Sequence, residues 1–182
     1  MSDQNVLIIK ASMHQNGNSD LLAEELKRGA EESGNHVTEI GVRKLNLHPC
    51  LGCNACHMKG REGQCVQKDD MPAVNEQMLK ADVIVFATPT YYYNMPGQLK
   101  ILIDRTYAVF TELKNKDFYY LISCTDDTNG SIDEVVRTFH GFAVCLPDSH
   151  ERGTVYGLNC PNHGDIKSHD AMRQAYELGR KI

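Results

Sequence analysis

The sequence predicts an α/β fold in which a five-stranded parallel sheet, in the strand order 2-1-3-4-5, is covered by helices on both faces. Strand-like and helical stretches alternate along the chain, as they do in parallel sheets. The strand-like stretches are continuous apolar runs such as Val6-Leu7-Ile8-Ile9, which is typical of strands buried on both faces. We find no internal repeat, low-complexity tract or linker in the 182 residues, so we expect one domain over 1–182.

The individual elements follow from the pattern of apolar residues and chain breakers. The first strand, 6–9, leads into a helix over 19–32, with Ser19 as its expected N-cap and Ser33-Gly34-Asn35 as its stop. Residues 43–70 form an irregular, cysteine-bearing insertion. The other expected strands are 37–40, 83–87, 118–123 and 154–157, and the other expected helices are 71–81, 99–109, 131–141 and 171–178.

Composition excludes several classes of function. The net charge of −5 argues against a nucleic-acid-binding surface, which needs clustered Lys and Arg. No apolar run approaches the roughly 20 residues of a membrane helix, so we expect no membrane partner. The N-terminal residues carry no basic leader, and seven cysteines in such a chain suggest metal, cluster or free thiols before disulfides. We therefore expect a cytoplasmic protein.

The loop after the first strand has the features of a phosphate site. In parallel sheets ligands bind beyond the carboxyl ends of the strands, which points to loops 10–18, 88–97 and 123–130. The first of these joins a buried strand to a helix N-terminus, where unpaired N–H groups and the helix dipole favour an anion. It is neither a Walker loop nor a G-x-G-x-x-G loop, and a solvated loop remains the alternative. The side chains that can donate to a phosphate are Ser12, Asn18 and Ser19.

The loop after the third strand is unusually aromatic. It carries three consecutive tyrosines, 91–93, between Pro89 and Pro96, in a chain with only 7% aromatic residues. A flat, largely apolar ring bound at this edge needs aromatic faces and fixed N–H donors, which such a loop can supply. A single tyrosine here fits the core or a subunit interface equally well. For the whole loop we favour a ligand.

At this point the sequence resembles the flavodoxin-like NAD(P)H-dependent FMN reductases and the related iron–sulfur flavoproteins. The first loop resembles the family's G-S-x-R-x-x-G-N-[ST] phosphate loop, with Ala11 in place of Gly and His14 in place of Arg. The cysteine segment resembles C-x-x-C-x-x-C…C-x-x-x-D-D-M. Further matches are the 89–95 segment, Leu99-Lys100, Asp104-Arg105, Gly164-Asp165-Ile166 and Ala175-Tyr176-Glu177-Leu178-Gly179.

The resemblance implies a flavodoxin-like three-layer sandwich that binds FMN and takes NAD(P)H as co-substrate. It implies homodimers or homotetramers, whereas the expectation of no nucleic-acid partner rests on the net charge. His14 would make phosphate binding depend on pH, since histidine changes charge near neutrality. The implied phosphate residues are Ser12, His14, Asn18 and Ser19; the implied ribityl and ring residues are Pro89, Thr90, Tyr91, Tyr92, Asn94 and Met95; and the third loop would contribute Cys124, Thr125 and Asp126.

Four cysteines form a second candidate site. Cys50, Cys53, Cys56 and Cys65 have the spacing C-x2-C-x2-C-x8-C. Successive x2 spacings resemble the loop around a [4Fe–4S] cluster, whereas zinc sites usually show two separated pairs. The x8 gap is longer than the compact cluster motif, so cluster, zinc, and reduced thiols or a disulfide all stay open, with thiols favoured.

Other polar residues have simpler explanations. We expect Asp69-Asp70 to cap the helix that starts near Met71, and Asp104-Arg105 to form an intramolecular ion pair or surface charges. The remaining cysteines, Cys145 and Cys160, are expected in packing or loops. Histidines without metal-type spacing are expected at the surface or satisfied internally: His57, His140, His150, His163 and His169.

The predicted activity is hydride transfer from NAD(P)H to bound FMN and on to a small acceptor such as a quinone or free flavin. The cofactor supplies the chemistry, which agrees with the lack of an evident catalytic acid or base. One alternative is an iron–sulfur flavoprotein that carries single electrons to a protein partner, for which the mild net charge is unfavourable. Another is a flavin-binding module without turnover.

Overall fold

The sheet has the predicted order. A computed structural model describes residues 3–128 and 130–182, and its five parallel strands run β2-β1-β3-β4-β5. Asn129, in the third predicted loop, lies outside the described residues. The strands are β1 (Asn5–Lys10), β2 (His36–Gly41), β3 (Val83–Pro89), β4 (Asp117–Ser123) and β5 (His150–Gly157).

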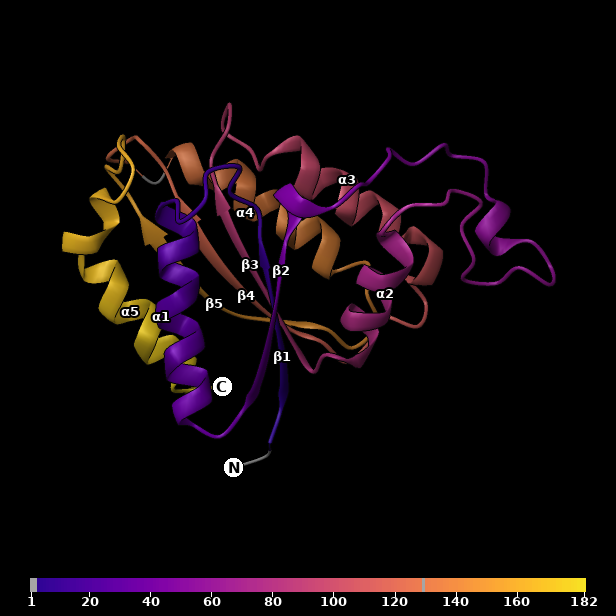
Figure 1. Cartoon of the computed structure of the whole chain (residues 1–182), viewed down its shortest axis with the longest axis horizontal. Coiled ribbons are helices and arrows are strands. Elements are labelled where there is room, and N and C mark those ends of the chain that lie inside the picture. The colour runs from indigo at the N-terminus through magenta and orange to yellow at the C-terminus, as the bar shows by residue number, and fades with distance from the viewer. Residues whose placement is uncertain (1–2, 129) are drawn as a thin grey trace.

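Helices cover both faces of the sheet, which confirms the three-layer arrangement (Figure 1). Two apolar cores result, one on each face. Residues 6–9 of β1 and 83–87 of β3 contribute to both cores and are at most 1% exposed, which explains their continuous apolar runs. One face carries α1 (Asn18–Glu32) and α5 (Asp170–Gly179), and the other carries α2 (Met71–Lys80), α3 (Gly97–Arg105) and α4 (Gly130–Ala143).

Most element boundaries agree with the predictions to within one or two residues, and the informative differences are these. Helix α1 begins at Asn18 with Gly17 in the cap position, so the prediction of Ser19 as N-cap is wrong: Ser19 lies buried in the first turn. The predicted helix 99–109 is α3 followed by a 3₁₀ turn over Thr106–Val109. Strand β5 begins four residues before the predicted strand, because its polar first half pairs with β4 at the sheet edge.

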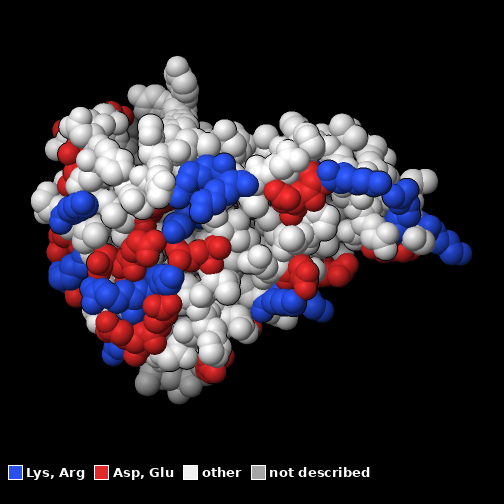
Figure 2. All heavy atoms as spheres, viewed as in Figure 1, with Lys and Arg blue, Asp and Glu red and all other residues white. Residues whose placement is uncertain are grey.

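The cysteine-bearing segment is irregular, as predicted, and extends away from the sheet (Figure 1). Short 3₁₀ turns, Val42–Lys44 and Ala55–His57, are its regular elements among the described residues. Lys and Arg alternate with Asp and Glu over the face shown in Figure 2. Among the described residues, every helix is too short or too polar to cross a bilayer.

Candidate flavin site

A cleft of about 420 Å³ lies beyond the carboxyl ends of the strands. It is lined by the loops that follow β1, β3, β4 and β5, so the topology brings together segments far apart in the sequence. Of the predicted cofactor residues, the cleft-lining ones are Ser12, His14, Asn18, Pro89, Thr90, Tyr91, Cys124 and Thr125.

The loop after β1 is folded tightly before any ligand enters. Ser12 Oγ donates to the carbonyl of His14 (2.9 Å) and accepts from the His14 N–H (3.2 Å). A Cβ atom at Gly17 would collide with Ser12 Oγ, so any other residue here would push the Ser12 hydroxyl out of its hydrogen bonds with His14. The loop therefore presents the N-terminus of α1 to the cleft in a fixed shape.

A buried ion pair supports this loop from behind. Asp20, in the first turn of α1, is 2% exposed, and its Oδ2 accepts from Arg43 Nη1 at 2.9 Å. The same Arg43 nitrogen donates to the carbonyl of Ser12 at 3.3 Å. Burial raises the pKa of Asp20, although Arg43 opposes the shift. The positive charge of Arg43 is therefore paired with Asp20 behind the loop.

Two buried hydroxyl groups at or next to the cleft have no hydrogen-bond partner within the described part of the chain. Ser19 Oγ is buried beside cleft-lining Asn18, and Thr90 Oγ1 belongs to a residue that lines the cleft. A buried hydroxyl without a partner is unfavourable, so such groups point to a ligand that supplies one. The phosphate and polar edge of FMN have the oxygen and nitrogen atoms to do so. The residues of the cleft therefore fit this cofactor.

Asn18 lines the cleft, but its side chain binds another loop. Its Nδ2 donates to the carbonyls of Cys160 (3.2 Å) and Asn162 (2.9 Å). Its Oδ1 accepts from the N–H groups of Gly164 (2.9 Å) and Ile166 (3.4 Å). Asn18 thus fastens the segment after β5, residues 158–166, across the start of α1. We call this segment the β5 strap.

The β5 strap supplies cleft residues that the sequence analysis did not include: Cys160, Pro161, Asn162 and His163. Gly17 and Ser123 also line the cleft, and the sequence analysis had assigned neither a contact role. The signal for the strap was its position after the last parallel strand, where the carboxyl-end rule applies as it does to the other loops.

The tyrosine loop forms a tight hairpin beside the cleft. Tyr91 and Asn94 pair in an isolated antiparallel bridge, with N–H···O distances of 2.7 and 3.0 Å. The residues between them have positive φ, 48° for Tyr92 and 61° for Tyr93, as in a type I′ turn. Tyr92 is fully exposed, and the hairpin projects above β3 (Figure 1). Tyr92 therefore lies at the tip, outside the cleft lining.

Three further predicted cofactor residues do not line the cleft. Asn94 Nδ2 donates to Thr138 Oγ1 at 3.2 Å, and Asn94 Oδ1 accepts from the N–H of Met95 at 2.8 Å. Met95 is 6% exposed and belongs to the core on the α2–α4 side. Asp126 accepts from the N–H of Asn159 through its carbonyl at 2.7 Å, which joins the third loop to the β5 strap.

Two thiols lie on the cleft wall. Burial is the main cause that raises the pKa of Cys124, and burial likewise raises the pKa of Cys160 to about 11. Both thiols are therefore neutral at physiological pH. They contribute polarisable, uncharged surface beside the ligand position.

The four cysteines of the predicted cluster motif lie apart from this cleft lining. Burial chiefly raises the pKa of Cys56, and the neighbouring Cys65, Cys50 and Cys53 raise it further, so these three thiols lie near Cys56. Within the described residues, no three His, Cys, Asp or Glu side chains are arranged to hold a metal ion.

A buried ion pair connects the cysteine segment to α3. Arg105 and Asp69 are bidentate, at 2.6 and 3.0 Å, with side chains 1% and 0% exposed. Arg105 also donates to the carbonyl of His48 (2.7 Å) and to Cys65 Sγ (3.5 Å). Burial works against ionisation of Asp69, but hydrogen bonds led by that from Arg105 lower its pKa to about 2.

This pair and its neighbours bear on two predictions. We expected Asp104-Arg105 to form an intramolecular ion pair or surface charges. The two residues pair with different partners: Asp104 with Lys100 at the surface, and Arg105 with buried Asp69. The expected capping of α2 is confirmed for Asp69, whose Oδ1 accepts from the N–H of Met71 at 3.2 Å. Asp70 occupies the cap position, but its side chain instead accepts from the N–H of Asn46.

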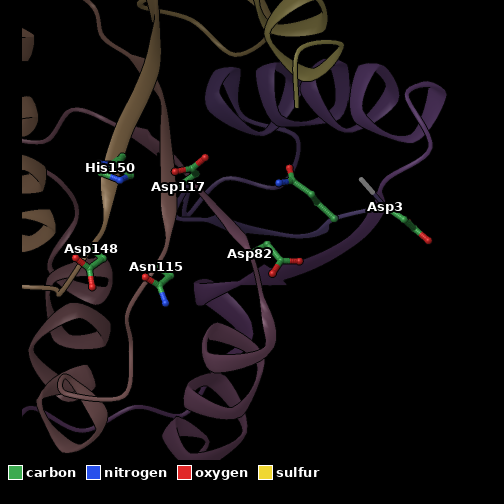
Figure 3. A pocket seen from close by; sticks show the side chains of 7 residues that line it. Asp3, Asp82, Asn115, Asp117, Asp148 and His150 are labelled. Atoms are coloured by element: carbon green, nitrogen blue, oxygen red, sulfur yellow. The ribbon is translucent and has the colours of Figure 1, made fainter. Parts of the chain in front are cut away.

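A second hollow, of about 500 Å³, lies at the opposite end of the strands from the cleft. Asp82 precedes β3, Asp117 begins β4 and His150 begins β5, and their side chains surround the hollow in Figure 3. Asp82 already accepts from the N–H of Asn5, and Asp117 pairs with Arg152. This is the amino end of the strands, where parallel sheets do not bind ligands.

The fold and the cleft define a flavodoxin-like protein with a ligand site at the carboxyl ends of its strands. Residues 4–146 match the family described as NADPH-dependent FMN reductase. An iron-sulfur flavoprotein of Methanocaldococcus jannaschii is 30% identical over 97% of this chain and 94% of its own length. One from Archaeoglobus fulgidus is 32% identical over 96% of this chain and 76% of its own length.

Solved structures show the same fold. A NAD(P)H:quinone oxidoreductase from Methanothermobacter marburgensis has a TM-score of 0.74 at 17% identity, with 99% of this chain and 96% of that chain covered. An azoreductase from Bacillus anthracis has a TM-score of 0.75 at 18% identity, with 98% and 100% covered. The chain belongs to the NADPH-dependent FMN reductase family and is an oxidoreductase that uses FMN and NAD(P)H.

Proposed function

We propose that the cleft at the carboxyl ends of β1, β3, β4 and β5 is the FMN site. One observation carries this proposal: four loops meet around a single cleft that contains a hydroxyl without a hydrogen-bond partner, Thr90 Oγ1. A second unpartnered hydroxyl, Ser19 Oγ, belongs to the residue that follows cleft-lining Asn18. The phosphate would lie at the start of α1, bound by Ser12, His14 and Ser19. The ribityl chain and ring would contact Pro89, Thr90, Tyr91, Cys124 and Thr125.

Bound FMN supplies a two-electron centre that accepts hydride from NAD(P)H and passes it to an acceptor. The loop around Gly17 fixes N–H donors toward the phosphate. Asn18 holds the β5 strap across one side of the cleft and thereby limits the access of water. Tyr92, Asn94 and Met95 act at a distance from the ring, by shaping the hairpin whose base, Tyr91, lines the cleft.

The acceptor we propose is a small, flat molecule of the quinone type. The exposed tyrosine hairpin beside the cleft supports this, because aromatic faces bind flat acceptors. We also propose a homodimer or homotetramer, supported by an apolar groove of about 720 Å³ between α3 and α4 that includes Tyr107 and Phe142. A cytoplasmic location is supported by the seven free thiols, which suit a reducing compartment.

Titration of the purified apoprotein with FMN tests the proposal. We expect quenched flavin fluorescence, a raised unfolding temperature, and anaerobic bleaching of the flavin band near about 450 nm by NADH or NADPH. Steady-state oxidation of NAD(P)H with quinones then measures acceptor use. A well-folded protein that neither binds FMN nor is stabilised by it would refute the proposal.

The second candidate function is single-electron transfer through FMN and a cluster at Cys50, Cys53, Cys56 and Cys65. The loose grouping of these thiols around Cys56 favours it, together with the names of the curated relatives. Anaerobic purification with an iron count tests it. About four irons per chain, lost when Cys56 is replaced by Ala, would support the cluster; an iron-free protein after reconstitution, coloured by flavin alone, would refute it.

A further inference from the structure

The candidate flavin cleft contains an unusual set of charges for a phosphate site. Within the described part of the chain, the lining residues include no Lys, Arg, Asp or Glu. The lining side chains that can carry a positive charge are His14, from the loop after β1, and His163, from the β5 strap. The phosphate of FMN carries between one and two negative charges near neutral pH. Histidines must therefore supply whatever positive charge lines the cleft.

Several charged groups around the cleft already have partners within the protein. Arg43 is paired with buried Asp20 behind the loop after β1. Asp165 accepts from the N–H of Asn162 within the strap at 2.7 Å. Asp20 and Arg43 largely neutralise each other, so this pair gives the cleft no fixed positive charge. The other charged groups on the surrounding segments are Asp126 and Asp127, in the third loop, and Lys167, beside Gly164.

His163 is held at the cleft by two sets of contacts. Its Nε2 lies 3.0 Å from the carbonyl oxygen of Gln15, so this nitrogen donates. The other ring nitrogen, Nδ1, then carries the second proton when the ring is charged. The hydrogen bonds of Asn18 to the strap, described above, fix the backbone on both sides of His163. The ring therefore stands at the phosphate loop although it is 149 residues further along the chain than His14.

We propose that His14 and His163 together bind the FMN phosphate and make the cleft select phosphorylated over unphosphorylated flavin. This inference rests on the proposed FMN site. It assigns His163, a residue of the last loop, to the recognition of the phosphate. Because riboflavin lacks the phosphate, the loss of either imidazole should weaken the binding of FMN and leave the binding of riboflavin unchanged.

The experiment measures dissociation constants of FMN and riboflavin by fluorescence at low salt and pH 6. The variants are His163→Gln, His14→Gln and the double variant. His140→Gln serves as the matched control, because His140 pairs with Glu151 at the surface away from the cleft. Circular dichroism of each apoprotein confirms folding. The double variant removes both imidazoles from the cleft lining.

We expect His163→Gln to weaken FMN binding by about tenfold, with riboflavin binding unchanged. The His140→Gln control should change neither. Unchanged FMN binding in His163→Gln, or equal weakening of FMN and riboflavin, overturns the inference. If neither flavin binds to the unmodified protein, the proposed FMN site fails instead. If riboflavin is too weak to measure, the FMN affinity of His163→Gln relative to that of the His140→Gln control decides.

Discussion

Replacing Asp69 by Asn should destabilise the protein strongly while barely changing its shape. The substitution removes the charge that Arg105 faces and leaves that guanidinium buried, 1% exposed, without its bidentate partner. Breaking a buried ion pair by removing one partner costs about 3–5 kcal/mol. For a domain of this size we expect the unfolding temperature to fall by roughly 6–20 °C.

The dependence on pH gives a second, independent measure of the same pair. The pKa of Asp69 is about 2 in the folded protein against an ordinary value of 3.8. Its stabilising contribution is therefore complete above the ordinary value and is lost as pH falls toward 2. The shift of nearly two pKa units corresponds to about 2 kcal/mol. The difference in unfolding free energy between the two proteins should be constant above pH 5 and shrink below it.

Urea unfolding followed by circular dichroism at several pH values measures both effects. The matched control is Asp104→Asn, because Asp104 pairs with Lys100 at 2.6 Å on the same helix but with both side chains about half exposed. Exposed pairs of this kind contribute about 0.3–0.5 kcal/mol. If Asp69→Asn costs no more than this control, or if its effect is the same at pH 7 and pH 3, the argument from burial is wrong.

Two further predictions concern the loops at the cleft. Gly17→Ala should weaken FMN binding at least about tenfold in a fluorescence titration, because its Cβ would displace Ser12 Oγ, whereas Gly97→Ala, which meets open space, should not; equal affinities would show that the turn is not needed. Replacing Tyr92-Tyr93 by Asn-Gly should raise the unfolding free energy by about 1 kcal/mol, because these residues suit positive φ at a type I′ turn; a lower unfolding temperature would contradict this.

The sheet could be predicted because its signal is local. Buried strands such as 6–9, 83–87 and 118–122 are apolar on both faces, so each shows as a short continuous apolar run. Strand β5 was predicted too short because pairing at a sheet edge does not require apolar residues, and His150 to Arg152 are exposed. Ser19 was mistaken for the N-cap because serine is favoured there, whereas the tight turn at Gly17 starts the helix earlier.

The partners of the charged residues could not be predicted, because they lie far apart in the chain. Asp69 and Arg105 are 36 residues apart, and the sequence around neither residue identifies the other as its partner. The tyrosine hairpin is a different case. Type I′ turns favour Asn-Gly, because both central residues need positive φ. Two tyrosines are disfavoured there, so turn propensity does not predict the turn at Tyr92 and Tyr93. Such failures are expected at functional positions, where strain is tolerated for another purpose.

Asn18 shows how a residue can be located correctly and still have a different role. The sequence places it in the phosphate loop, and it does line the cleft. Its side-chain amide, however, makes its hydrogen bonds to Cys160, Asn162, Gly164 and Ile166. An asparagine can serve either a ligand or a neighbouring backbone, and the choice depends on which segment the topology brings beside it. Here that segment follows β5. The loop that is predicted to bind the phosphate therefore also fixes the β5 strap, which forms one side of the cleft.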